Sequence, residues 1–219
     1  MREGVCDGVP GTTCGEYYYE SAAGTSAHGY LRPVLHSLLA DVGSSAEILD
    51  LGCGNGSLTA AFLTRERRIT GVDYSVSGIA LALGHYPAIR FLQADVCGAL
   101  PPEIRPGGFD AVMCCEVVEH VYSPKALMKN CYRLLRPGGF LILTTPYHGY
   151  LKNLALALSG RMDRHFTPLW EGGHVKFWSR RTLSQLLREE GFEAVVFRGA
   201  GRVPWLWKSL VFKARKPGG

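Results

Sequence analysis

Residues 48–56 read ILDLGCGNG, an apolar run that leads into a loop with three glycines. The apolar run predicts a buried strand, and the Ala/Leu-rich segment after Gly56 predicts a helix. Glycines between a strand and a helix let the backbone approach a ligand, and the first turn of the helix offers unpaired N–H groups. This stretch therefore predicts an α/β fold with a ligand site at the end of a strand.

Strand-like and helix-like segments alternate on both sides of this loop. Further strands are expected at 68–73, 88–96, 108–115, 140–146, 191–197 and 206–214, and helices at 31–42, 75–86, 123–135 and 181–190. This alternation is typical of a doubly wound, mostly parallel sheet. We divide the chain into an N-terminal arm at 1–24, expected to be mobile, and one domain at 25–219. An insertion at about 147–178 breaks the pattern and is the expected substrate region.

The composition restricts the class of protein. The chain has 219 residues, of which 47% are hydrophobic and 20% charged, with a net charge of +5; these values are typical of a folded domain. We expect a cytoplasmic protein, because no segment has the roughly 18 apolar residues of a membrane span and no secretion signal is evident. The basic residues form no stripe, so no nucleic-acid partner is expected. The oligomeric state stays open.

Acidic residues follow the glycine loop at informative positions. Asp73 ends the strand after the loop, where a carboxylate can bind two ribose hydroxyls, and Asp95 ends the next strand, where it can accept from an adenine amine. The loop reads GxGxG, whereas a nicotinamide dinucleotide site would need a third glycine at Ser57. Asp50, directly before the loop, would repel a pyrophosphate and can pair with an ammonium group. The pattern indicates a nucleoside ligand that carries a positive amine.

The segments ILDLGCGNG, GVDYS, LQADV, FDAVMCCEVVEHV and RPGGFLILTTP resemble, in order and spacing, the class I S-adenosylmethionine-dependent methyltransferases over about residues 46–216. The resemblance implies a Rossmann-like sheet of seven strands, the last antiparallel, with S-adenosylmethionine across the carboxyl ends of the first four. The residues that it implies at this cofactor are Asp50, Gly52 and Gly54 (methionine part), Asp73 (ribose), Asp95 and Val96 (adenine), together with Tyr74 and Glu116.

The segment CCEVVEHV, residues 114–121, carries a second set of candidates. Glu116, Glu119 and His120 share one face if the chain turns helical at Glu116. The segment is similar to the ubiquinone-biosynthesis O-methyltransferases and to small-RNA terminal 2′-O-methyltransferases, in which such a set and a later histidine are associated with a divalent metal. Here His174 in GGHVKF is the later histidine. The resemblance thus implies a site of these four residues for Mg²⁺ or another divalent cation. The alternative is a metal-free site with His120 as general base.

The leading hypothesis is an enzyme that transfers a methyl group to a hydroxyl of a phenolic, lipid-like or natural-product molecule, with His120 and His174 as catalytic residues. The alternatives are transfer to nitrogen, carbon or sulfur, or a cofactor-binding partner subunit without activity. RNA is disfavoured as a substrate, and membrane contact is not favoured.

Three further expectations concern the arm and the insertion. One of the tyrosines at 17–19 either closes the site or packs in an ordinary way. His148 and His165 are expected on the surface. The apolar stripe at 154–158 is expected to form a lid packed on the sheet, rather than to cover a hydrophobic ligand or lie on a membrane.

Overall fold

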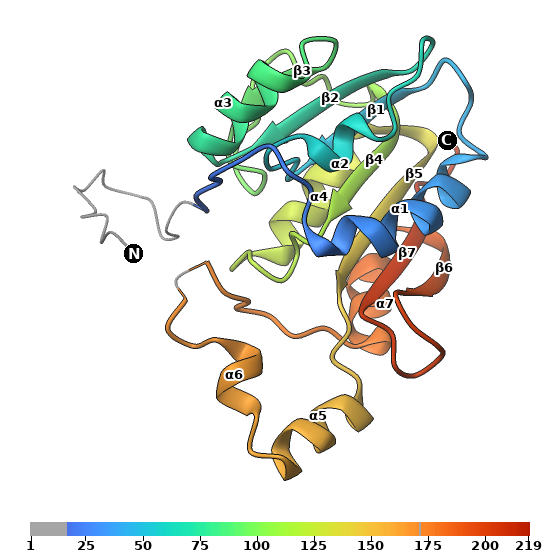
Figure 1. Cartoon of the computed structure of the whole chain (residues 1–219). Coiled ribbons are helices and arrows are strands. Elements are labelled where there is room, and N and C mark those ends of the chain that lie inside the picture. The colour runs from blue at the N-terminus through green and yellow to red at the C-terminus, as the bar shows by residue number, and fades with distance from the viewer. Residues whose placement is uncertain (1–16, 171) are drawn as a thin grey trace.

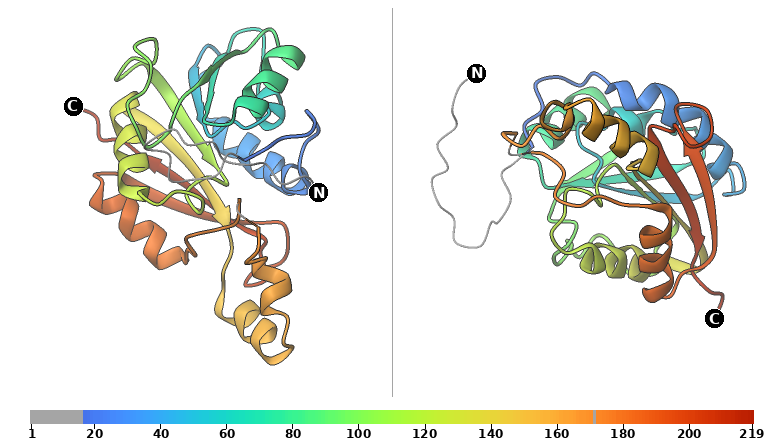
Figure 2. Two further views of the ribbon diagram at one scale, coloured as in Figure 1. Left: turned by 90° about the vertical axis from the view of Figure 1, so that its left-hand side faces the viewer. Right: turned by 90° about the horizontal axis from the view of Figure 1, so that it is seen from below.

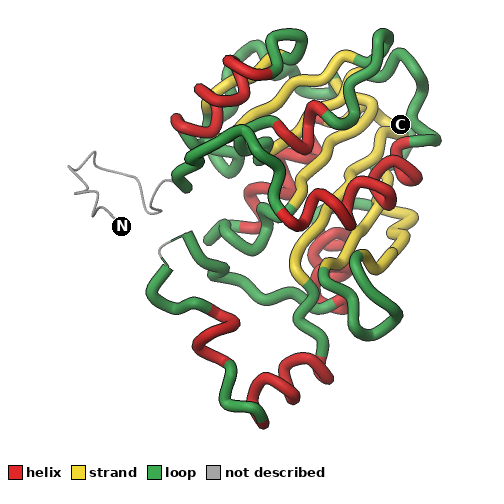
Figure 3. The backbone as a smooth tube through the Cα atoms, in the orientation of Figure 1, coloured by secondary structure: helices red, strands yellow, loops and turns green. Residues whose placement is uncertain are grey.

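The computed structural model describes residues 17–170 and 172–219, and these form one seven-stranded sheet with helices around it (Figures 1 and 3). The strands are β1 (Glu47–Leu51), β2 (Arg68–Asp73), β3 (Arg90–Gln93), β4 (Phe109–Cys115), β5 (Leu135–Pro146), β6 (Glu193–Ala200) and β7 (Ser209–Arg215). Their order across the sheet is β3-β2-β1-β4-β5-β7-β6. Within this sheet, β7 alone runs in the direction opposite to the other six strands. The predicted fold class, a doubly wound, mostly parallel sheet of seven strands, is confirmed.

Helices cover both faces of the sheet, because successive side chains of a strand point to opposite sides (Figure 2). The helices of the sheet are α1 (Ser26–Leu39), α2 (Ser57–Ala60), α3 (Val76–His85), α4 (Pro124–Leu134) and α7 (Arg180–Glu189). Ile48 and Ala111 belong to the core under α1, α2 and α3, whereas their neighbours Leu49 and Val112 belong to the core under α4 and α7. Burial on both faces explains the near-continuous apolar runs of the central strands.

Helix α1 differs from its predicted bounds, and α2 covers only part of the Ala/Leu-rich segment after Gly56. Helix α1 begins before the expected residue 31, because Ala27 and Tyr30 pack against the core and stabilise a first turn that the sequence GTSAHG disfavours. Helix α2 is shorter than expected. The N–H groups of Ala61 and Phe62 donate to carbonyls three residues back, which ends the α-helical pattern.

The insertion after β5 projects beyond the carboxyl end of the sheet (Figures 1 and 2). It contains α5 (Tyr150–Leu158) and α6 (Met162–Phe166), and no residue of either helix is buried. The expectation that 154–158 form a lid packed on the sheet is therefore wrong. The chain leaves the sheet at Pro146, and α5 packs mainly beside α6.

The strand order reverses between β1 and β4, since the chain moves outward from β1 to β3 and then returns to the other side of β1. In open α/β sheets, ligands bind outside the carboxyl ends of the strands at such a reversal. The predicted cofactor residues lie in the last residues of these strands or shortly after them. No described helix has both the length and the apolar character needed to cross a membrane.

The fold predicts that substitution of two leucines, one in β5 and one in α5, will affect stability very differently. Leu143 in β5 is fully buried, whereas Leu158 in α5 is 81% exposed. Leu143→Ala is expected to lower the free energy of unfolding by about 2–5 kcal/mol because it leaves a cavity. Leu158→Ala is expected to change it by less than about 0.5 kcal/mol. Urea unfolding of both variants measures the difference, and equal losses would contradict this packing.

Candidate functional site at the carboxyl edge of the sheet

The glycine loop joins β1 to α2 in a backbone conformation that other residues rarely adopt. Gly52 has φ 89° and Gly54 has φ 54°. The N–H of Gly52 donates to the carbonyl of Val72 at 2.7 Å, which ties the loop to the end of β2. A Cβ at Gly52 would collide with the side chain of Val117, and one at Gly54 with the ring of Tyr19. The loop therefore needs glycine for its conformation and for its close neighbours.

Asp73 lies beside this loop at the end of β2. Its carboxylate accepts hydrogen bonds from the N–H groups of Gly54 at 2.7 Å and Ser75 at 2.8 Å. Tyr74 follows it and is 39% exposed. After β3, Asp95 is exposed and Val96 is buried. The residues predicted to hold the ribose and adenine thus follow two neighbouring strands at one edge of the sheet.

Asp50 of β1 is buried behind the loop, and one of its oxygens has no protein partner. The hydroxyl of Thr59 donates to Oδ2 at 2.6 Å, whereas Oδ1 accepts no hydrogen bond from the described residues. Burial raises the pKa of Asp50 to about 7, the Thr59 hydrogen bond opposes the rise, and the charge of Asp73 adds to it. A buried carboxylate of this kind fits a positively charged ligand group, which would stabilise its ionised form.

The segment after β4 forms a turn and not the expected start of a helix. Glu116 has φ 55°, which an α-helix excludes, and His120 closes a turn by donating its N–H to the carbonyl of Val117 at 2.9 Å. The N–H of Glu116 bonds instead to the carbonyl and hydroxyl of Thr144 in β5. The prediction that Glu116, Glu119 and His120 share a helix face is therefore wrong, because bonds to the neighbouring strand hold the backbone.

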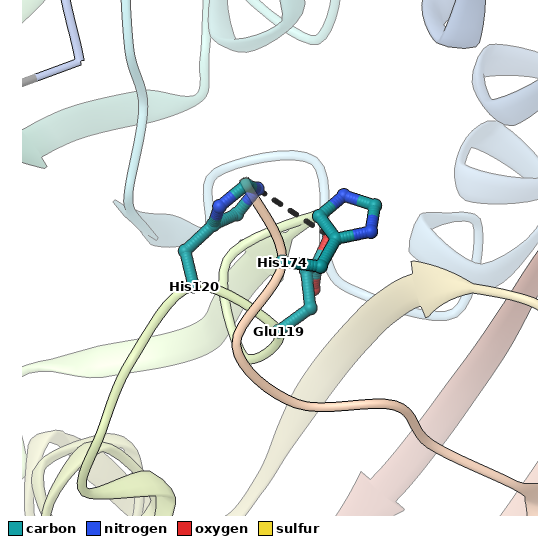
Figure 4. A group of neighbouring side chains, drawn as sticks. All are labelled: Glu119, His120 and His174. Carbon is teal, nitrogen blue, oxygen red and sulfur yellow. Dashed lines mark ion pairs between the residues drawn. The ribbon is translucent and has the colours of Figure 1, made fainter. Parts of the chain in front are cut away.

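Glu119, His120 and His174 nevertheless lie together (Figure 4). One ligand atom of each residue lies within 4.8 Å of those of the other two. Nε2 of His120 lies 4.0 Å from Oε1 of Glu119, and the two imidazole rings are 4.9 Å apart between centroids. The N–H groups of Val175 and Lys176 donate to the carbonyl of Glu119. These bonds bring the loop with His174 to the turn after β4.

Glu116 lies outside this group of three. The hydroxyl of Thr144 donates to its carboxylate at 2.7 Å, and that of Ser209 at 3.4 Å. Burial raises the pKa of Glu116 to about 7, and these two hydrogen bonds oppose the rise. Its predicted roles at the cofactor and at a metal stay predictions, and its hydroxyl partners come from β5 and β7.

The carboxyl group of Glu119 is buried and only half satisfied. Thr145 donates to Oε2 at 2.9 Å, and Oε1 has no hydrogen-bond partner in the part of the chain that the structure describes. Burial and the charge of Glu116 raise the pKa of Glu119 well above 4.5. As at Asp50, a cation beside the unpartnered oxygen would stabilise the ionised form.

The two histidines of the group are neutral at pH 7. Burial lowers the pKa of His120, and burial with the charges of His120 and Lys152 lowers the pKa of His174 to about 4. Nδ1 of His120 lies 3.3 Å from the carbonyl of Gly173. Because a carbonyl only accepts, Nδ1 carries the hydrogen and Nε2 keeps its lone pair. Two neutral imidazoles and a carboxylate are a donor set that fits a divalent cation.

A family model described as "Methyltransferase domain" matches residues 25–196. The chain belongs to this methyltransferase family. A ubiquinone biosynthesis O-methyltransferase of Pseudomonas aeruginosa is 36% identical over 149 residues, which cover 67% of this chain and 64% of that enzyme. The match thus spans less than two thirds of the relative's length. Membership confirms the resemblance to methyltransferases that the sequence indicated.

Solved structures share the fold of this methyltransferase domain. A methyltransferase from Bacillus halodurans gives a TM-score of 0.64 at 17% identity and covers 84% of this chain and 98% of its own. Phosphoethanolamine N-methyltransferase 2 of Haemonchus contortus, solved with S-adenosyl-L-methionine, gives 0.64 at 17% identity and covers 91% of this chain and 54% of its own. At these identities the likeness concerns the fold alone.

Part of the N-terminal arm packs on the glycine loop of the methyltransferase domain. Residues 1–16 of the predicted mobile arm lie outside the described residues. Tyr19 lies against Gly54 and Gly78, and burial raises its pKa far above the usual value. The side chain of Asn55 donates to the carbonyls of Ser21 and Ala23. Of the three candidate tyrosines, Tyr19 is therefore the one whose ring contacts the glycine loop. Asn55, which holds the arm to this loop, is a residue that sequence analysis missed.

His148 also differs from its expectation. Its ring nitrogens are buried without a partner in the described structure, and its ring lies 6.1 Å from that of His174 between centroids. Phe166 stacks on it and Phe177 meets it edge-on. The prediction that His148 lies on the surface is wrong, because these aromatic rings of the insertion cover it. His165 is exposed, as expected.

The threonines of FLILTTP are the other missed residues. Thr144 binds Glu116 and Thr145 binds Glu119. Both are buried at the carboxyl end of β5, beside the end of β4. Two hydroxyls at the end of an apolar strand are the signal that could have indicated partners for buried carboxylates.

Asp50 predicts how stability depends on pH in the ligand-free protein. Its carboxyl ionises near pH 3.8 when unfolded and near pH 7 when folded, so stability falls as pH rises through this range. Asp50→Asn removes the effect. Between pH 4 and 7.5, the free energy of unfolding of the unsubstituted protein should fall by up to about 4 kcal/mol relative to that of the variant. Urea unfolding of both proteins at both pH values measures this difference.

Asp163→Asn is the matched control, because Asp163 is exposed in α6. It should leave the pH dependence of stability unchanged. If the free energy of unfolding depends on pH in the same way for Asp50→Asn and the unsubstituted protein, the description of Asp50 as a buried, poorly paired carboxylate is contradicted.

Proposed function

We propose that this protein transfers a methyl group from S-adenosylmethionine to a hydroxyl oxygen of a small molecule. The observation that carries the proposal is a pair of buried carboxylates, Asp50 in β1 and Glu119 in the turn after the neighbouring strand β4. Each has one oxygen without a hydrogen-bond partner among residues 17–170 and 172–219. The family membership supports the reaction. The Pseudomonas relative, a ubiquinone biosynthesis O-methyltransferase, supports oxygen as the acceptor.

The residues around the glycine loop would hold the cofactor. Oδ1 of Asp50 would accept from the ammonium group of its methionine part, and the backbone of Gly52 and Gly54 would allow close approach. Asp73 would accept from the ribose, held in place by the N–H groups of Gly54 and Ser75. When bound, the cofactor supplies a sulfonium leaving group. The protein then mainly places the acceptor oxygen in line with the methyl group.

Glu119, His120 and His174 would hold a divalent cation at the substrate. When bound, such a cation lowers the pKa of a coordinated hydroxyl, and a phenol needs this because its usual pKa is about 10. Thr145 orients the carboxylate through Oε2, and the carbonyl of Gly173 fixes the tautomer of His120. Groups that orient ligands in this way are common behind metal sites. An acceptor with two adjacent oxygens would suit the site.

The cofactor part predicts selective binding. Calorimetric titration should show binding of S-adenosylmethionine and none of NAD. Asp73→Asn should weaken S-adenosylmethionine binding by about tenfold or more, since it removes a charged acceptor of ribose hydroxyls. Asp163→Asn, at the exposed position in α6, should bind like the unsubstituted protein. Binding of NAD without S-adenosylmethionine would refute the proposed reaction.

The proposed cation site predicts that the protein binds Mn²⁺ and that the affinity depends on the carboxylate of Glu119. Glu119→Gln should weaken Mn²⁺ binding more than about tenfold, whereas Glu66→Gln, at an exposed position, should have no effect. Free Mn²⁺ is measured by electron paramagnetic resonance. Affinity should rise with pH, because the raised pKa of Glu119 means that binding must displace a proton.

Turnover separates the cation site from a metal-free base. Labelled S-adenosylmethionine and a panel of catechols and phenols test methyl transfer with and without a chelator. Loss of transfer in chelator and in Glu119→Gln supports the cation site. Full transfer under both conditions would contradict it and leave His120, whose Nε2 keeps its lone pair, as the general base.

A further inference from the structure

A groove between α5 and the loop that joins β6 to β7 lies outside the methyl-transfer site. It has a volume of about 300 Å³, within reach of a small ligand. Apart from Ser159, the groove is lined by two kinds of side chain, apolar ones such as Leu151, Leu206 and Trp207, and the cationic ones Lys152, Arg161 and Arg202. The figures agree that α5 and this loop are neighbours beyond the end of the sheet (Figures 1 and 2).

The three cations of the groove pair with no acidic residue in the part of the chain that the structure describes. No carboxylate lines the groove, and none of the ion pairs found in the described structure involves Lys152, Arg161 or Arg202. Lysine on a surface usually extends its ammonium group into water. Lys152 is instead half-buried, and burial with the charge of Arg202 lowers its pKa to about 8. An anion bound between Lys152 and Arg202 would relieve this unfavourable arrangement.

The apolar part of the groove is unusually exposed. Leu151 is 57% exposed and Leu206 is 48% exposed, and Trp205 beside them is 66% exposed. The ring of Trp207 is fixed in place, because it packs edge-on against Tyr147 at 5.5 Å between centroids. Apolar side chains beside unpaired cations suit a ligand that has both an apolar body and an acidic head.

We propose that this groove binds an amphipathic anion, with a phosphate or carboxylate head between Lys152 and Arg202 and an apolar body against Leu151, Leu206 and Trp207. Such a ligand could be a free amphiphile or the head and upper chain of an acidic lipid. Lys152 also lies close enough to His148 and His174 for its charge to lower their pKa values. The head of the ligand would therefore lie on the side of the groove nearer the histidines. The site stands independently of the proposed methyl transfer, because binding is measured without cofactor.

Calorimetry with decyl phosphate below its micelle concentration tests the site. The full chain should bind one molecule, and it should bind inorganic phosphate and decyltrimethylammonium at least about tenfold more weakly. The double variant Lys152→Gln/Arg202→Gln should weaken decyl phosphate binding by about tenfold or more. The matched control is Arg65→Gln/Lys129→Gln, which removes the same charge from exposed positions outside the groove. It should stay within about twofold of the unsubstituted chain.

Two outcomes would overturn the proposal. One is an equal loss of binding in both double variants, which would show a general charge effect. The other is equal binding of decyltrimethylammonium, which would show apolar contact without anion recognition. Unchanged thermal unfolding of both double variants ensures that any loss is local.

Vesicle sedimentation identifies the source of the ligand. Binding to phosphatidylglycerol vesicles but not to phosphatidylcholine vesicles, lost in Lys152→Gln/Arg202→Gln alone, supports the site and indicates an acidic lipid. Binding of monomeric decyl phosphate without vesicle binding supports it equally and indicates a free amphiphile. Failure of decyl phosphate to bind at all would contradict the proposal and leave the cofactor and cation predictions untouched.

Discussion

Burial of negative charge at the carboxyl edge of the sheet is the constraint on which the site depends. Asp50 lies in β1 and Glu119 in the turn after β4, the strands between which the order reverses, and each keeps one oxygen without a hydrogen bond from the described residues. A threonine hydroxyl donates to the other oxygen of each carboxylate, Thr59 to Oδ2 of Asp50 and Thr145 to Oε2 of Glu119. Buried carboxylates arranged in this way are costly without a cation, and this cost favours binding of positive groups.

The two positive groups that we propose are the ammonium group of the cofactor at Asp50 and a divalent cation at Glu119, and the segments that would bind them are in contact. Val117, in the turn after β4, packs against Gly52 of the glycine loop. The turn that presents Glu119 and His120 is therefore in contact with the loop proposed to hold the cofactor. This contact is consistent with a cation site beside the transferable methyl group, as in-line transfer to a coordinated oxygen requires.

The fold could be predicted from the sequence because its signals are local. Apolar runs such as 48–51 and the glycine loop indicate strands and their turns without knowledge of distant residues. The conformation of Glu116 could not be predicted, because bonds to Thr144 in another strand decide it. The same holds for His148, whose burial depends on Phe166 and Phe177, and for Tyr19, whose place at Gly54 depends on the path of the arm. Residue types identified the candidates, and contacts distant in sequence decided their arrangement.

The insertion explains why the family alone leaves the substrate open. Its helices bury none of their residues, and its loop supplies His174 to the group with Glu119 and His120. One segment thus contributes both to the proposed cation site and to the cationic groove. The segment lies beyond the carboxyl end of the sheet, so changes in it would leave the sheet unaltered.

A crystal structure of the protein with S-adenosylhomocysteine and Mn²⁺, with anomalous diffraction data, tests both proposed sites at once. We expect the nucleoside over the glycine loop, its ammonium group at Oδ1 of Asp50, and an anomalous peak within coordination distance of Glu119, His120 and His174. An occupied cofactor site in which Oδ1 of Asp50 contacts no positive group, and no anomalous peak at the three residues, would contradict this expectation.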